Sequence, residues 1–112
     1  MVRPADKDEL LPGTLEMLIL RTLAHGEAHG YAIARHIQMT SRDVLQIEEG
    51  SLYPALQRLL VKGWVTAEWG ASETNRRARY YRMTPAGRRQ LGEEISSFER
   101  QVRAIKLVLE DA

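Results

Sequence analysis

The chain of 112 residues is long enough for one small domain and too short for two domains with separate hydrophobic cores. It has no cysteine, which excludes disulfides and metal sites built from thiolates. No run of about 18 apolar residues is present, and the charged N-terminus lacks the apolar segment of a secretory signal. We therefore expect a cytoplasmic protein without a membrane partner.

Charged residues are distributed unevenly along the chain, although the formal net charge is only +1. Six arginines fall within residues 76–89, a segment without aspartate or glutamate, whereas acidic residues gather near both ends. The planar guanidinium of arginine suits two-point contact with phosphate or guanine. Such a segment either forms a solvated face or presents a local positive field to a polyanion, and its place in the fold decides which.

The first part of the chain predicts an irregular N-terminal arm over residues 1–12 and then a helix over residues 14–25. Thr14 is the candidate N-cap of this helix, and Gly26 is a natural stop. Its expected buried face repeats at helical spacing and consists of Leu15, Leu18, Ile19 and Leu23. A second helix is expected over residues 29–40.

Residues 44–47 have the composition of a strand, and we expect a short edge strand there. A third helix is expected over residues 51–62, with Pro54 in its first turn, where a missing N–H costs little. Its inward face consists of Leu52, Leu56, Leu59 and Leu60, and its outward face of Ser51, Gln57, Arg58 and Lys62.

A β-hairpin follows this helix. Residues 64–69 and 77–83 have strand composition, and residues 70–75 have loop composition between them. The order helix, helix, strand, helix, hairpin is that of a winged helix-turn-helix domain. The sequence therefore predicts an α+β fold that is mostly α, with the winged helix domain over residues 13–84.

The C-terminal residues 85–112 predict one long helix, because Thr84 supplies an N-cap and Pro85 suits the first helical position. Apolar residues along it are spaced alternately four and three apart, the pattern of a seam that packs against another helix. The seam consists of Leu91, Ile95, Phe98, Val102, Ile105 and Leu109. We expect dimerisation through this seam, the alternative being a helix folded back onto its own domain.

Several segments of the chain resemble the PadR family of bacterial transcriptional regulators. They occur in unbroken order and are LPGTLEMLIL (11–20), HGYAI (29–33), GSLYPAL (50–56), RL (58–59), GWV (63–65) and RYYRMTPAG (79–87). The resemblance implies a winged helix domain followed by one C-terminal dimerisation helix, as in the short subgroup of the family. It also implies a repressor that leaves its operator when a small aromatic molecule or another signal is sensed.

Three residues of the third helix are candidates for contact with base edges in the major groove, namely Ser51, Gln57 and Arg58. Ser51 is alternatively an N-cap. Tyr53 is a candidate for phosphate contact through its hydroxyl, although its ring could also pack inward. Lys62 is a further candidate for DNA contact. In the hairpin we assign DNA contact to Arg76, Arg77 and Arg79, which lie near its tip. Arg82 is a weaker candidate. A dimer would place two such helices about one turn of DNA apart, which predicts an inverted-repeat operator.

Other functions are less well supported by the sequence. No nucleophile with a base, carboxylate pair or phosphate-binding glycine loop occurs at useful spacing, so we expect neither an enzyme nor a cofactor. A metal-sensing regulator would have to use His25, His29 and His36 together with carboxylates. A protein-interaction module that does not bind DNA is the remaining alternative.

Aromatic residues offer a possible site for a small aromatic effector. Those that could line a cavity between the winged domain and the C-terminal helix are Tyr31, Tyr53, Trp64, Trp69 and Phe98. The same residues could equally belong to the ordinary hydrophobic core.

Overall fold

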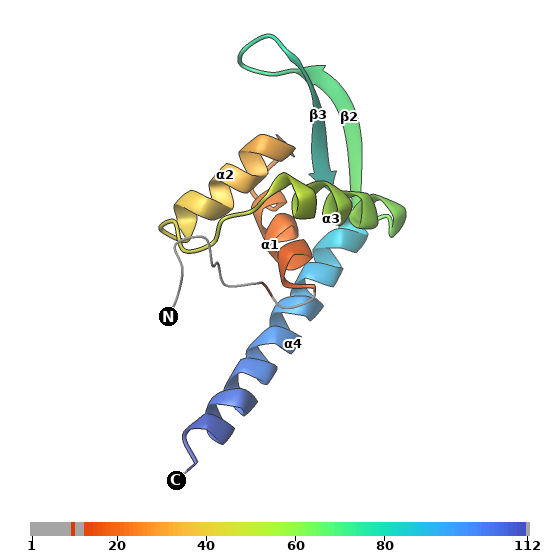
Figure 1. The fold of residues 1–112 in the computed structure, drawn as a ribbon. Coiled ribbons are helices and arrows are strands. Elements are labelled where there is room, and N and C mark those ends of the chain that lie inside the picture. Colours follow the sequence, from red (N-terminus) through yellow and green to blue (C-terminus); the bar gives the residue numbers. More distant parts are fainter. Residues whose placement is uncertain (1–9, 11–12, 112) are drawn as a thin grey trace.

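The computed structural model describes residue 10 and residues 13–111, and within them the fold is α+β with most residues in helices (Figure 1). The elements in chain order are α1 (Thr14–Leu23), β1 (Ala28–His29), α2 (Gly30–Thr40), α3 (Glu49–Val61), β2 (Val65–Ala71), β3 (Arg77–Met83) and α4 (Pro85–Leu109). This is the predicted winged helix arrangement with one C-terminal helix. The arm expected over residues 1–12 lies, except for residue 10, outside the described residues.

The sheet corrects one part of the sequence-based prediction. Its strand order is β1-β3-β2, all antiparallel, with Ala28 opposite Tyr81 and Val65 opposite Met83. The third strand of the sheet is therefore β1. The prediction of an edge strand over residues 44–47 is wrong, because that segment is irregular. Leu45 and Ile47 pack against the core without strand pairing, which explains their apolar character.

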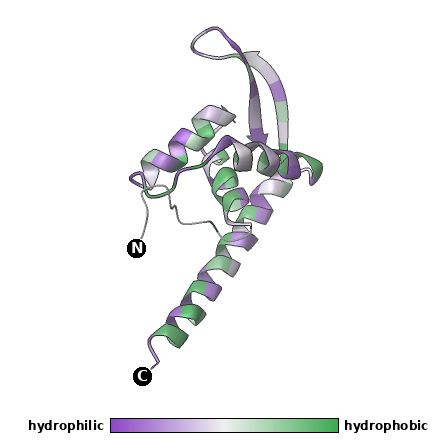
Figure 2. Cartoon of the chain, viewed as in Figure 1, coloured by the Kyte–Doolittle hydropathy of each residue, from purple (hydrophilic) through white to green (hydrophobic). Residues whose placement is uncertain are grey.

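The core lies where α1, α2 and α3 meet one face of the sheet. The fully buried large side chains are Ile19, Leu20, Ile33, Leu52, Leu56, Leu59 and Val65. Figure 2 shows apolar segments within each of these helices. The predicted inward faces of the first and third helices are confirmed at Ile19, Leu23, Leu52, Leu56 and Leu59.

Two predicted helix starts are wrong and one is confirmed. Gly13, with φ of 83°, occupies the N-cap of α1, so Thr14 is already its first helical residue. Helix α3 begins at Glu49, because the Glu48 carbonyl already accepts hydrogen bonds from the amides of Ser51 and Leu52. Ser51 therefore lies inside the first turn and is not an N-cap.

At α4, the Thr84 hydroxyl accepts a hydrogen bond from the Gly87 amide at 3.0 Å, and Pro85 follows as predicted. The helix then runs past the core and extends away from the rest of the molecule (Figure 1). Leu91 is buried, and Ile95 packs against the core of its own domain. These two members of the predicted seam therefore contact the core of their own domain. The alternative of a helix folded back onto its own domain predicts such contacts.

Beyond Ile95, the remaining seam residues of α4 are more accessible. Phe98, Ile105 and Leu109 are exposed, and Val102 is partly buried. Figure 2 shows apolar residues continuing along this free half of α4. Within the part of the chain that the structure describes, no helix is long and apolar enough to span a bilayer.

Candidate nucleic-acid interface

The solvent-exposed face of α3 has a defined centre and two borders. Its centre consists of Gly50, Pro54, Gln57 and Val61, which are spaced four, three and four apart and are all exposed. Ser51, Arg58 and Lys62 lie along the border nearer α1, and Tyr53 lies along the other border, next to α2. The predicted outward residues are thus exposed, but only Gln57 among them lies at the centre.

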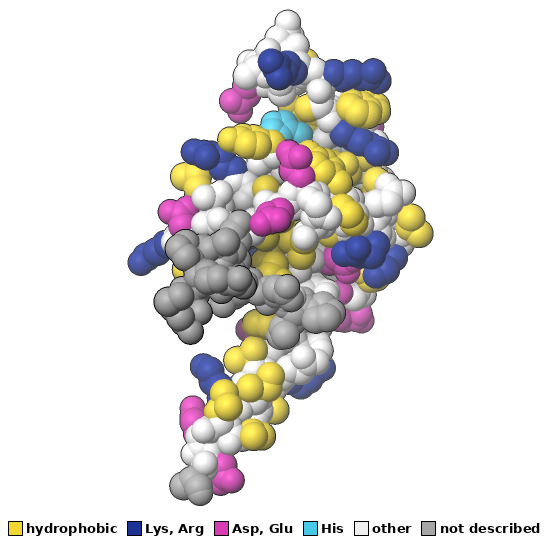
Figure 3. Space-filling model, viewed as in Figure 1, with side chains coloured by type: hydrophobic (Ala, Val, Ile, Leu, Met, Phe, Trp, Pro, Cys, Tyr) yellow, Lys and Arg dark blue, Asp and Glu magenta, His cyan; other side chains and the backbone are white. Residues whose placement is uncertain are grey.

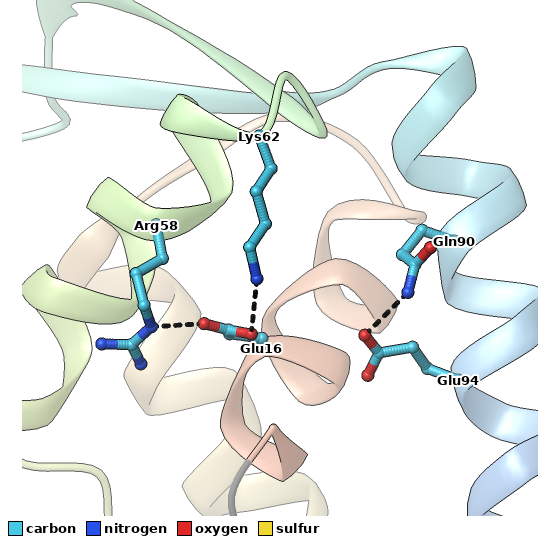
Figure 4. Close-up of polar contacts among 5 residues, drawn as sticks. All are labelled: Glu16, Arg58, Lys62, Gln90 and Glu94. Atoms are coloured by element: carbon cyan, nitrogen blue, oxygen red, sulfur yellow. Dashed lines mark hydrogen bonds and ion pairs between the residues drawn. The ribbon is translucent and has the colours of Figure 1, made fainter.

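Arg58 and Lys62 share an acidic partner on α1 (Figure 4). Arg58 Nε donates a hydrogen bond to Glu16 Oε1, and Lys62 Nζ lies 3.8 Å from Glu16 Oε2. The Glu16 side chain is only 9% exposed, whereas that of Arg58 is 54% exposed. About half of the Arg58 side chain therefore stays open to solvent while its Nε is bound to Glu16.

Tyr53 packs its ring against the start of α2. A Cβ atom placed on Gly30 would lie 2.9 Å from the Tyr53 hydroxyl oxygen, so the absence of a side chain at Gly30 makes room for this ring. The Tyr53 side chain is nevertheless exposed. Both alternatives considered for Tyr53 are compatible with this position, since the ring packs while one edge stays accessible.

The hairpin formed by β2 and β3 places arginines around an exposed indole. Trp69 lies opposite Arg79, and the Arg77 and Arg79 guanidiniums lie 4.5 Å and 6.0 Å from the centre of the Trp69 ring. These three residues share one face because side chains alternate along paired strands. Figure 3 shows basic and hydrophobic side chains intermingled around the hairpin at the top of the view.

Arg76 and Arg82 have different surroundings from these two arginines. Arg76 is exposed in the turn, where its carbonyl accepts a hydrogen bond from the Ser72 amide. Arg82 lies on the opposite face of β3, and its Nη2 is 3.6 Å from Glu27 Oε1. The structure thus separates Arg82 from the group near the tip, as strand alternation predicts.

The five aromatic residues considered for an effector site are spread over the molecule. Phe98 lines a groove of about 960 Å³ between α1 and α4, together with Met17 and polar residues of α4. Tyr31 and Tyr53 line a smaller hollow between α2 and α3. Trp69 is on the hairpin, and Trp64 packs beneath Lys62 at 4.7 Å. One cavity lined by all five is therefore not formed.

The three histidines do not converge on one point. His29 Nδ1 accepts a hydrogen bond from the Ala32 amide at 3.1 Å and so caps α2. The rings of His25 and His36 lie 5.6 Å apart. Among the described residues, no group of three histidine, aspartate or glutamate side chains is placed to hold a metal ion.

The structure adds three residues to this surface that the sequence did not indicate. Val61 is 77% exposed at the centre of the α3 face, and its spacing of four from Gln57 could have indicated this position. Trp69 was considered for a cavity or for the ordinary core, and it instead lies exposed on the hairpin. Glu16 is an acidic residue inside an apolar helical segment, a signal that a cation lies opposite it.

The chain matches known regulators in sequence and in fold. It matches the Transcriptional regulator PadR-like family over residues 19–93. Transcriptional regulator Rv3488 of Mycobacterium tuberculosis is 32% identical over 97 residues, which cover 87% of each chain.

Solved structures agree with this assignment. A transcriptional regulator from Clostridium thermocellum superimposes with a TM-score of 0.77 at 31% identity, covering 84% of this chain and 91% of that one. A PadR family transcriptional regulator from Eggerthella lenta gives a TM-score of 0.77 at 31% identity, covering 89% and 85%. The family match begins within α1 and ends within α4, and it includes α2, α3 and all three strands of the winged helix fold. The chain therefore belongs to the PadR-like family of transcriptional regulators.

Proposed function

We propose that this chain is a sequence-specific DNA-binding repressor of the cytoplasm and not an enzyme. The observation that supports it best is the exposed face of α3, which combines hydrogen-bonding and apolar side chains as a major-groove surface requires. Gln57 would pair with adenine, Arg58 with guanine, and Val61 would contact a thymine methyl group. Ser51, Tyr53 and Lys62 would contact the DNA at the borders of this face.

The hairpin would position the protein on the DNA backbone. Arg76, Arg77 and Arg79 are exposed near its tip, and arginine suits both phosphate contact and insertion into a narrow minor groove. Trp69 would hold two of these guanidiniums by cation–π contact, which limits their loss of freedom on binding.

We propose further that residues 13–84 bind DNA and residues 85–112 join two copies into a homodimer. The support is the exposed apolar side of α4 at Phe98, Ile105 and Leu109, with Val102 between them, because a lone soluble chain rarely leaves such a stripe uncovered. Leu91 and Ile95 would support the seam from within each chain. Two copies related by a twofold axis would recognise an inverted repeat.

A response to a small aromatic effector would involve the groove between α1 and α4. Phe98 offers an aromatic surface there, and Gln90 and Glu94, which are hydrogen bonded to each other at 3.0 Å, offer polar contacts. An effector bound at this place would alter how α4 leaves the domain and hence the spacing of the two α3 helices. A thermal-shift screen with phenolic compounds, followed by a DNA-binding assay, tests this step.

Selection from a random pool of DNA duplexes tests the DNA-binding proposal directly. We expect enrichment of an inverted repeat with half-sites about 10 base pairs apart. If six to eight phosphates are neutralised per dimer, log K should fall with log salt with a slope of about −5 to −7. A slope near zero, or a pool without enrichment after several rounds, would contradict sequence-specific binding.

A further inference from the structure

Glu16 carries a carboxylate that is almost fully buried in the folded protein. It lies on α1, a helix with several buried apolar residues, and its side chain is 9% exposed. A buried carboxylate is costly unless a cation or hydrogen-bond donor accompanies it. Here the partners are Arg58 and Lys62, one helical turn apart on α3. The fold therefore links a side chain of α1 to the DNA-facing border of α3.

The geometry of the Arg58 contact leaves its terminal nitrogens turned away from Glu16 (Figure 4). The bond to Glu16 uses Nε, the inner nitrogen of the planar guanidinium. Because the group is planar, holding Nε in place restricts the direction of both terminal nitrogens. A guanine presents two acceptors in the major groove, O6 and N7, which a guanidinium in a fixed orientation can bind together.

We propose that Glu16 is a positioning residue that orients Arg58 for base-specific contact. The inference rests on the proposed DNA binding and adds a determinant of specificity that does not itself touch DNA. The expected change in DNA affinity on removal of the Glu16 carboxylate is opposite to the one that charge alone predicts. A carboxylate near a polyanion repels it, so its removal should by charge alone strengthen binding to every duplex. Under this proposal, its removal instead weakens binding to the preferred sequence.

Lys62 has a different role in this group. Its Nζ is 3.8 Å from Glu16 and lies over the Trp64 ring, beyond hydrogen-bond distance of the carboxylate. Lys62 therefore balances the charge of Glu16, but the contact does not fix the orientation of its ammonium group. Two cations around one carboxylate leave the border of α3 positively charged, as contact with DNA requires.

The test compares the wild-type protein with Glu16→Gln, Arg58→Lys and the double variant. The DNA probes are a duplex that the wild-type protein selects from a random pool and an unrelated duplex of equal length. We expect Glu16→Gln to lower the ratio of the two affinities about tenfold, the lower end of what one bidentate pair contributes. Binding to the unrelated duplex should stay the same or strengthen. Arg58→Lys should lower the ratio similarly, and Glu16→Gln should add nothing further to it.

A DNA-free measurement separates positioning from misfolding. In NMR spectra of the wild-type protein, the Arg58 Nε–H proton should exchange slowly with water. Glu16→Gln should weaken that protection while the backbone amide spectrum is kept, because a neutral amide oxygen is a poorer acceptor than a carboxylate. Glu99→Gln, which removes an exposed carboxylate from α4, should change neither the ratio nor the Arg58 signal.

The outcomes distinguish this inference from the proposed function. If Glu16→Gln strengthens or weakens binding to both duplexes equally, Glu16 is not a determinant of specificity and the inference is wrong. An additive double variant would overturn it as well. A wild-type protein that selects no sequence would instead contradict the proposed function itself, and with it this inference.

Discussion

Tyr81 and Trp69 lie on the same face of the hairpin but in different surroundings. Tyr81 is 4% exposed at the edge of the core, whereas Trp69 lies farther along β2, where the helices no longer cover the sheet. The indole is flanked by Arg77 and Arg79 there. Alternation along the strands identifies residues that share a face, but it does not say where along the strand the core ends.

Burial has a titration consequence at Tyr81. Desolvation raises the pKa of the Tyr81 hydroxyl above its ordinary value, and the nearby Arg79 opposes this only partly. The unfolded chain therefore releases this proton at lower pH than the folded chain does. The contribution of Tyr81 to stability should be constant below about pH 10 and fall as the pH rises above it.

Urea unfolding at pH 8 and pH 11 measures this effect. The wild-type protein should lose more unfolding free energy between the two values than Tyr81→Phe does, since phenylalanine does not titrate. Tyr31→Phe, at an exposed position on α2, serves as the control and should lose as much as the wild type. Equal losses in wild type and Tyr81→Phe would contradict the prediction.

At the scale of elements, α4 is joined to the sheet by a close backbone contact. The Thr84 hydroxyl donates a hydrogen bond to the Gly63 carbonyl at 2.8 Å, and the Thr84 amide donates one to the Trp64 carbonyl at 3.0 Å. A Cβ atom on Gly87 would lie 2.1 Å from that same Trp64 carbonyl oxygen. Glycine at this position allows the first turn of α4 to approach β2.

Gly87→Ala should therefore destabilise the protein by about 1–3 kcal/mol, because a forced shift of the backbone outweighs the better helix propensity of alanine. Gly92→Ala is the matched control: it lies on the same helix, and a Cβ atom there meets nothing within 4 Å. It should stabilise by about 0.5–1 kcal/mol. Urea unfolding at one fixed protein concentration measures both, and equal stability of Gly87→Ala and wild type would disprove the contact argument.

At the scale of the whole molecule, the half of α4 beyond Ile95 exposes apolar side chains that the described part of the chain does not cover. Ile105 is 50% exposed within the predicted seam, and Leu107 is 72% exposed on the opposite side of the helix. Both residues are exposed and aliphatic, and they differ mainly in the side of α4 on which they lie. They provide a matched pair for testing which side of α4 meets a second copy.

Ile105→Glu should weaken dimerisation about 100-fold or more, since it buries two uncompensated carboxylates at a symmetric interface. Leu107→Glu, the same change on the other side, should leave the dimer intact. Sedimentation velocity over a range of concentrations gives the association constants, with circular dichroism as the check on folding. A wild-type protein that stays monomeric at tens of micromolar, or a stronger effect of Leu107→Glu, would contradict dimerisation through the predicted seam.

Features that depend on neighbouring residues were predictable from the sequence. The helices, the hairpin and the cap at Thr84 followed from periodicity, strand composition and the Thr-Pro pair, because each arises within a few residues of chain. The outward residues of α3 followed from the same periodicity. Local patterns therefore determined the fold class and most of the candidate site.

Features that depend on distant contacts were decided only by the tertiary structure. Strand β1 has two residues, too few for a periodic signal, and exists because it pairs with β3. Leu91 belongs to the seam by spacing but to the core by position, since spacing does not tell which neighbour a helix face meets. Arg58 is paired with Glu16, 42 residues earlier in the chain. Such contacts form when helices pack in three dimensions, and no local pattern determines them.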